Sequence, residues 1–158
     1  MRRRAILRVI TFMTLGAGAV GVGAPSALAA THVSTLAPPV IHEQFTLLPC
    51  TPGTTLGMEG CAEHELLRAD QRIDREVRVL FGLVYDNAAR ERLAKAQATW
   101  LVFRQADCLS QSDIYEGGTQ AAVAFGQCAV RDDNARSGQL HGFYLGLVQG
   151  RHNPPTFP

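Results

Sequence analysis

Seven apolar side chains recur at spacings of three and four residues in the middle of the chain, and this repeat constrains the fold more than any other feature. They are Ala62, Leu66, Ala69, Ile73, Val77, Leu80 and Val84. The spacing predicts one amphipathic α-helix from about Thr55 to Gly82, with an N-cap at Thr54 or Thr55. A helix with one apolar face needs other elements to cover it, so the rest of the chain must supply them.

Two further helices are predicted after the first. Helix-favouring residues predict the second from about Asn87 to Ser110, with an inner face of Leu93, Ala96, Trp100 and Phe103. Paired glycines predict a loop at 112–118, after which Thr119 can cap a third helix that ends before Gly150. The apolar stripe of that helix is Ala121, Phe125, Cys128, Ala135, Leu140, Phe143 and Leu147. No segment alternates as a strand would, and short loops favour antiparallel neighbours, so an all-α, antiparallel three-helix bundle is expected.

The beginning of the chain has the pattern of an export signal. Four arginines within the first eight residues precede an apolar run, and residues 27–29 read Ala-Leu-Ala, a small-x-small cleavage pattern. We therefore predict a signal peptide at 1–29 and a periplasmic or secreted protein without a membrane anchor after cleavage. The run is short and glycine-rich for a membrane span. The arginines fit either general secretory or twin-arginine export, and the sequence leaves that choice open.

Removal of the signal peptide would leave 129 residues, which suits a single domain. We expect an extended, proline-rich arm at 30–48, a helical domain at 49–150 and a short tail at 151–158. Phe45, Leu47 and Leu48 are the apolar residues with which the arm can dock. The remaining chain has 11 basic against 14 acidic side chains, a formal charge of −3, which argues against nucleic-acid binding.

All four cysteines follow the predicted signal peptide: Cys50, Cys61, Cys108 and Cys128. An even number in an exported chain predicts two disulfides, and we expect both to lie at the same end of the bundle and to stabilise it. Proximity along the chain favours Cys50 with Cys61 and Cys108 with Cys128. The alternative is a metal site, suggested by Cys61 and His64. Oxidation would remove its thiols and no Cys-x-x-Cys pair exists, so neither a metal nor another cofactor is expected.

Trp100, Arg104 and Cys108 lie at intervals of four residues, which places them on one helical stripe. The bundle register predicts Trp100 in the core and two groups of ion pairs: Arg104 with Glu65 and Asp132, and Asp70 with Arg136. The alternative for Arg104 is a ligand-binding arginine. The chain has no phosphate loop, zinc-protease motif or nucleophile elbow, so we do not expect an enzyme.

Several separated motifs resemble the lysozyme inhibitor LprI N-terminal domain family. They are TTLGMEGCAEHELLRAD at 54–70, AQATWLVFRQADC at 96–108, EGGT at 116–119, and Cys128 followed by Arg136-x-x-x-Leu140. Together they cover about Pro49 to Leu145 in the order and spacing of the family. The resemblance implies a small exported helical domain that binds and inhibits a lysozyme or a related cell-wall-degrading enzyme. Unlike the lipoprotein that gives the family its name, this chain has no lipidation cysteine after the leader.

The loop at 112–118 is the candidate partner-binding surface. Its residues of interest are Asp113, Tyr115, Glu116, Gly117 and Gly118. An acidic bundle that presents these side chains suits the basic cleft of a lysozyme. The alternative for the loop is that it only joins two helices. The alternative for the protein is an envelope structural or stress-linked binding module without lysozyme affinity.

Overall fold

The computed structural model describes residues 36–158, so the predicted signal peptide and the start of the arm lie outside the described residues. Three α-helices make up most of this range: α1 (Thr55–Leu83), α2 (Asn87–Ser112) and α3 (Thr119–Val148), with a short 3-10 helix, η1 (Asp113–Tyr115), after α2. No strand occurs in residues 36–158, which confirms the all-α prediction. None of these helices is both long and apolar enough to span a bilayer.

Side-chain caps explain where the first two helices begin. The hydroxyl of Thr54 accepts a hydrogen bond from the backbone N–H of Gly57 at 3.0 Å, and Asp86 accepts one from the N–H of Ala89 at 2.6 Å. Each cap satisfies an N–H group that has no partner within its own helix. The predicted starts of α1 and α2 are therefore confirmed.

The third helix is preceded by a tight turn. Glu116 and Gly117 both have a positive φ, 50° and 73° respectively, a conformation that glycine adopts without strain. Gly118 then takes the N-cap position, and Thr119 is the first helical residue rather than the cap. The positive φ of Glu116 and Gly117 thus reverses the chain within a few residues, and Gly118 is extended.

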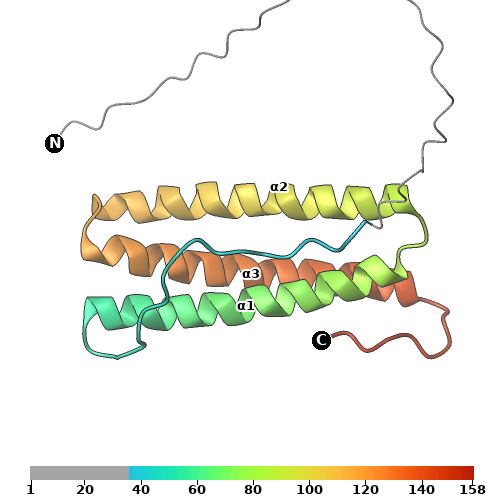
Figure 1. The fold of residues 1–158 in the computed structure, drawn as a ribbon, viewed down its shortest axis with the longest axis horizontal. Coiled ribbons are helices and arrows are strands. Elements are labelled where there is room, and N and C mark those ends of the chain that lie inside the picture. Colours follow the sequence, from blue (N-terminus) through green and yellow to red (C-terminus); the bar gives the residue numbers. More distant parts are fainter. Residues whose placement is uncertain (1–35) are drawn as a thin grey trace, which may run out of the picture. The chain divides into compact units, whose positions relative to one another are not determined.

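Figure 1 shows the three helices side by side, with the direction of the chain reversing at each connection. Helix α3 packs against both α1 and α2, whereas α1 and α2 make few contacts with each other. An element other than a helix is therefore needed to fill the space between α1 and α2.

The arm, residues 36–48, occupies that space (Figure 1). Its backbone N–H groups donate to α1: Ile41 to Asp74 at 3.0 Å, and Leu48 to Glu63 at 2.7 Å. Its partly buried side chains also pack on the core, Ile41 against the apolar cluster that contains Ile73 and Phe45 against the one that contains Leu66. The arm is extended as predicted, and it is an integral part of the packing.

The core consists of two apolar clusters. The larger comprises Ile73, Val77, Leu80, Phe81, Leu83, Val84, Leu93, Leu140 and Tyr144. The smaller comprises Leu66, Cys108, Cys128 and Ala129. In each helix, a buried charged residue lies in sequence between the members of the two clusters: Asp70 in α1, Arg104 in α2 and Asp133 in α3. The two ends of the bundle are therefore held together in different ways.

The predicted inner faces of α2 and α3 are partly wrong. Phe103 is 59% exposed and Phe143 is 43% exposed, although the apolar period predicts both on inner stripes. The buried positions of α2 include Gln97 and Arg104, and those of α3 include Asp133. A search for apolar periodicity misses these positions because the buried side chains are polar.

Both disulfides join cysteines that are neighbours along the chain: Cys50 with Cys61, and Cys108 with Cys128. These are the pairs that the sequence favoured. The first disulfide draws residues 49–51 against the start of α1, where a Cβ on Gly57 would lie 1.7 Å from the carbonyl oxygen of Thr51. Gly57 therefore permits a close approach of backbone that any side chain would prevent.

The tail folds back on α3. The hydroxyl of Tyr144 donates to the carbonyl oxygen of Pro155 at 2.6 Å, and the ring of Phe157 lies 4.7 Å from that of Tyr144. The aromatic contact buries part of the end of α3 that faces away from the disulfides. The tail thus extends the larger core cluster.

Candidate functional site

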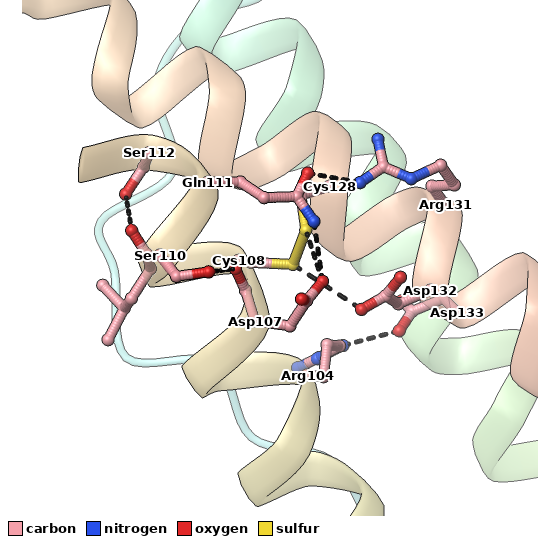
Figure 2. The surroundings of a disulfide bond; sticks show 11 residues. Arg104, Asp107, Cys108, Ser110, Gln111, Ser112, Cys128, Arg131, Asp132 and Asp133 are labelled. Atoms are coloured by element: carbon pink, nitrogen blue, oxygen red, sulfur yellow. Dashed lines mark hydrogen bonds and ion pairs between the residues drawn. A yellow bond between two sulfur atoms is a disulfide. The ribbon is translucent and has the colours of Figure 1, made fainter. Parts of the chain in front are cut away.

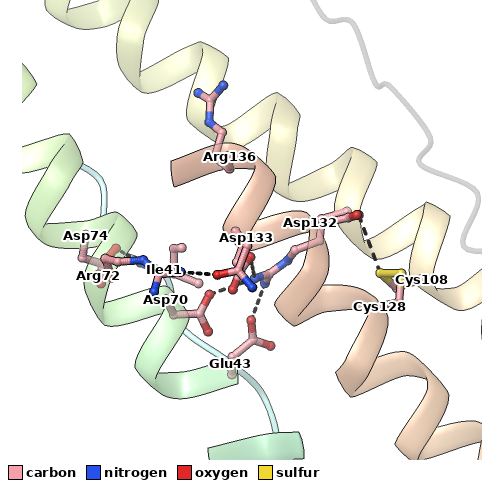
Figure 3. A network of polar contacts seen from close by, with 12 residues as sticks. Ile41, Glu43, Asp70, Arg72, Asp74, Cys108, Cys128, Asp132, Asp133 and Arg136 are labelled. Atoms are coloured by element: carbon pink, nitrogen blue, oxygen red, sulfur yellow. Dashed lines mark hydrogen bonds and ion pairs between the residues drawn. A yellow bond between two sulfur atoms is a disulfide. The ribbon is translucent and has the colours of Figure 1, made fainter. Parts of the chain in front are cut away.

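Arg104 is the centre of a buried charged cluster that connects the arm with all three helices. Its Nη1 donates to Asp70 of α1 at 2.8 Å and to Asp133 of α3 at 2.7 Å, and its Nη2 donates to Glu43 of the arm. Figure 3 shows the three acidic side chains converging from these different segments. Arg104 is only 5% exposed, so the cluster is shielded from water.

The cluster contains three carboxyl groups and one guanidinium, and this imbalance affects protonation. Burial, together with the nearby charge of Asp133, raises the pKa of Asp70 to about 7. Burial also raises the pKa of Asp133. For Arg104, burial alone would lower the pKa, but the charges of Asp133 and Asp70 outweigh it and raise the pKa. A proton on the aspartate pair would relieve the excess of negative charge.

Two oxygen atoms of the aspartates support this interpretation. Oδ2 of Asp70 and Oδ2 of Asp133 are buried and have no hydrogen-bond partner among the described residues. A carboxylic acid can donate where a carboxylate cannot, so one shared proton would supply a missing bond. The positive charges of the guanidinium and of this proton together neutralise two of the three carboxylate charges in the cluster.

The predicted partners of Arg104 are wrong. Glu65 is exposed, and Asp132 points toward the Cys108–Cys128 disulfide instead (Figure 2). A helical side chain leans toward the N-terminus of its helix, so Arg104 extends away from the disulfides and meets Asp70 rather than Glu65. Asp132 precedes Asp133 by one residue, which turns it about 100° around α3.

Arg136 does not pair with Asp70 as expected. Its Nε donates to Gln97 at 3.2 Å and its Nη1 donates to Gln139 at 3.1 Å. The guanidinium groups of Arg104 and Arg136 both lie over the ring of Trp100, 5.3 Å and 5.6 Å from its centroid. Trp100 is half-buried against the larger apolar cluster rather than central to it. Its ring serves as a platform for two cations.

Glu43 is the member of the cluster that sequence reasoning missed. It lies in the arm, which has no periodic pattern from which a facing residue can be inferred. The only available signal was the apolar alternation around it, since Ile41 and Phe45 both pack on the body. All the hydrogen bonds of the Arg104 guanidinium go to carboxyl groups of the protein, so the geometry favours a structural role for this cluster.

The Cys108–Cys128 disulfide has an acidic environment (Figure 2). Oδ2 of Asp132 lies 3.8 Å from Sγ of Cys108, and Oδ2 of Asp107 lies 3.7 Å from Sγ of Cys128. Burial and the charge of Asp107 raise the pKa of Asp132. The spacing resembles a metal site, but the sulfurs are bonded to each other and cannot supply thiolate ligands.

The candidate loop projects from the same end of the bundle. Ile114 is 73% exposed and Tyr115 is 41% exposed, and the carboxyl groups of Asp113 and Glu116 also face solvent. Gly117 and Gly118 form the turn described above. The structure thus places all the predicted loop residues at the surface.

A groove of about 360 Å³ begins beside this loop and passes between the arm, α1, α2 and α3. Its apolar walls include Phe45, Leu66, Leu109 and Phe125, and its charged lining residues are Glu59 and Glu63. We call the groove and loop 112–118 together the disulfide-end surface. It combines exposed apolar area with acidic groups and contains no basic side chain among its lining residues.

The sequence was compared with known proteins. Residues 50–140 match the family described as Lysozyme inhibitor LprI. No curated protein and no solved structure shows significant similarity. The match covers more than half of the chain and includes both disulfides and three members of the charged cluster, Asp70, Arg104 and Asp133, whereas Glu43 lies outside it. The protein therefore belongs to the LprI lysozyme inhibitor family.

Proposed function

We propose that this protein is an exported inhibitor that binds a lysozyme or a related cell-wall-degrading enzyme through its disulfide-end surface. One observation carries the choice of surface: its apolar groove has only acidic residues, Glu59 and Glu63, among its charged lining residues. Membership in a family of lysozyme inhibitors supports the choice of partner. Charge complementarity favours a basic enzyme.

The groove suits a lysine or arginine side chain of such an enzyme. The aliphatic part of that side chain would lie against Leu66 and Phe125, while its charged end would meet Glu59. The exposed side chains of Ile114 and Tyr115 would add apolar contact area beside the groove. This combination of an anchored cation and a flanking aromatic residue is typical of the centre of a protein interface.

The disulfides would favour binding by limiting conformational freedom. Cys50–Cys61 and Cys108–Cys128 hold the segments on either side of the groove in place. A preorganised surface loses less conformational entropy when it binds than a flexible one. Two disulfides also fit an oxidising compartment, which supports the proposal that residues 1–29 direct export.

Titration of the oxidised protein into a basic lysozyme acting on cell walls tests the proposal. We expect the lytic rate to fall at micromolar protein. The double variant Asp113→Asn/Glu116→Gln and the single variant Glu59→Gln should each weaken inhibition about tenfold, since each removes negative charge from the proposed contact. Glu91→Gln, an exposed residue of α2, is the matched control because it removes one negative charge outside the disulfide-end surface.

Two results would argue against the proposal. If the folded, oxidised protein leaves the lytic rate unchanged, that lysozyme is not its target, and an envelope binding module without lysozyme affinity becomes the better account. If the protein inhibits but all variants behave like the Glu91→Gln control, inhibition uses a different surface. A pull-down from an envelope extract would then identify proteins that bind it.

A further inference from the structure

A second cavity lies on the opposite half of the bundle and has the opposite charge. It has a volume of about 480 Å³ and lies between α2 and α3, near the connection between α1 and α2. Its charged lining residues are Arg92 and Arg136, and its apolar ones include Leu93, Leu140 and Phe143. A neighbouring hollow shares Arg92 and adds Lys95 and Phe103. Neither has an acidic residue in its lining.

Neither arginine of this cavity forms an ion pair with a carboxylate of the described residues, although the charge of Arg92 is near enough to help lower the pKa of Asp86. No ion pair within residues 36–158 includes Arg92 or Arg136. Arg136 is half-buried, and its bonds to Gln97 and Gln139 are to neutral amide oxygens. The other deeply placed arginine, Arg104, has three carboxyl partners. A half-buried guanidinium without a counter-ion, on the wall of a cavity, indicates a site for an anion.

The floor of the cavity limits what kind of anion fits. Leu93 is 7% exposed and Leu140 is 2% exposed, so apolar core side chains form the bottom, while Phe143 is 43% exposed at the rim. An inorganic ion would leave this apolar surface uncovered. Burying an apolar body there would be favourable in proportion to the area removed from water. The volume lies within the range of small-molecule sites.

We propose that this cavity binds a soluble amphipathic anion, with its carboxylate or other oxyanion head on Arg92 and Arg136 and its alkyl or aryl body on Leu93, Leu140 and Phe143. The site is independent of the disulfide-end surface. Its ligand differs in charge from the basic partner proposed there. A result at one site therefore does not decide the other.

The single tryptophan provides a direct measurement, because Arg136 lies 5.6 Å from the ring centroid of Trp100. An anion on Arg136 should alter the environment of the ring and its fluorescence. Decanoate is a suitable probe. Decanol is the control for its alkyl chain without the carboxylate, and acetate is the control for its carboxylate without the long chain. We expect a saturable fluorescence change with decanoate at concentrations up to about 1 mM, and a response at least tenfold weaker with decanol or acetate.

Variants test the assignment of the head group by calorimetry, which does not depend on the tryptophan signal. Arg92→Gln and Arg136→Gln should each lower decanoate affinity about tenfold, as expected for loss of one charged hydrogen-bond donor. Arg92 is exposed, so its variant should fold normally. Arg68→Gln, at another exposed arginine, on α1, should bind decanoate like the unaltered protein.

Several results would overturn the proposal. They are the absence of saturable decanoate binding, equal binding of decanol, and unchanged affinity in both Arg92→Gln and Arg136→Gln. A fourth is binding to vesicles of phosphatidylglycerol without any response to free decanoate, which would indicate a membrane-contact surface instead of a cavity for a soluble ligand.

Discussion

The two ends of this bundle are stabilised by different means. The end that contains Leu80, Leu93 and Leu140 has nine buried side chains in one apolar cluster, and the tail covers part of it. The cluster at the disulfide end has only four, two of which are the bonded cysteines Cys108 and Cys128, although Ala62 and Val123 are buried at that end as well. At this end, the two disulfides and the Arg104 cluster contribute the stabilisation that apolar packing contributes at the other end. Ile114 and Leu109 are exposed at the disulfide end and available to a partner.

Removal of the central arginine should have the largest effect on stability. Arg104→Ala would leave Asp70 and Asp133 buried without a counter-ion, and we expect the free energy of unfolding to fall by roughly 3–5 kcal/mol. Urea denaturation measures this difference. Arg68→Ala, at an exposed position of α1, should change stability by less than about 0.5 kcal/mol. Equal stability of the two variants would show that the charged cluster does not join the segments.

Loss of the Cys108–Cys128 disulfide should have the second-largest effect on stability. The double variant Cys108→Ala/Cys128→Ala removes a link across a separation of 20 residues. We expect the free energy of unfolding to fall by about 3 kcal/mol. Hydrogen exchange should accelerate more at the start of α3 than around Leu80, because the larger apolar cluster is unchanged. Uniform acceleration along all three helices would mean that the two ends are not stabilised separately.

The aspartate pair should make stability depend on pH. The pKa of Asp70 is about 7 in the folded protein against an ordinary value of 3.8, so the folded state binds a proton that the unfolded state has lost. Stability should therefore fall as pH rises from about 4 to 7. Asp70→Asn, which keeps the shape but cannot ionise, should reduce this decline. Melting temperatures at pH 5 and pH 8 measure it, and identical slopes in both proteins would exclude Asp70 as the cause.

The smallest effect is expected in the arm. Glu43→Gln should cost about 1 kcal/mol or less, because a neutral amide can still accept a hydrogen bond from Arg104. Faster hydrogen exchange at the amides of Ile41 and Leu48 would report the loosening, since both donate to α1 only when the arm is docked. The helices should exchange as before. Exchange that accelerates in α2 instead would show that Glu43 stabilises α2 more than it stabilises the docking of the arm.

Local sequence signals predicted the helices well. Thr54, Asp86 and the Gly117-Gly118 pair set helix boundaries through contacts within a few residues, so they can be inferred without knowledge of the tertiary structure. The resemblance to the LprI family is also confirmed.

The charged cluster could not be predicted in detail, for two physical reasons. Buried polar positions such as Gln97 and Asp133 break the apolar period from which the helix register is inferred, so the sequence predicts Asp132 in place of its neighbour Asp133. Glu43 lies in an extended segment and contacts Arg104, which is 61 positions later in the sequence. No sequence repeat relates these two residues. The groove of the disulfide-end surface was missed for the second reason as well, because Phe45 of the arm forms part of its wall.

The position of the arm also has a consequence for the order of assembly. Glu43 precedes all three helices in the chain, yet its partner Arg104 lies in α2, and Asp133 of α3 completes the same cluster. During synthesis the arm is therefore made first and can dock only after most of the chain has followed. Contacts that close such long loops carry a large entropic cost and form late. The first segment of the cluster to be synthesised is therefore expected to be the last to take its place in it.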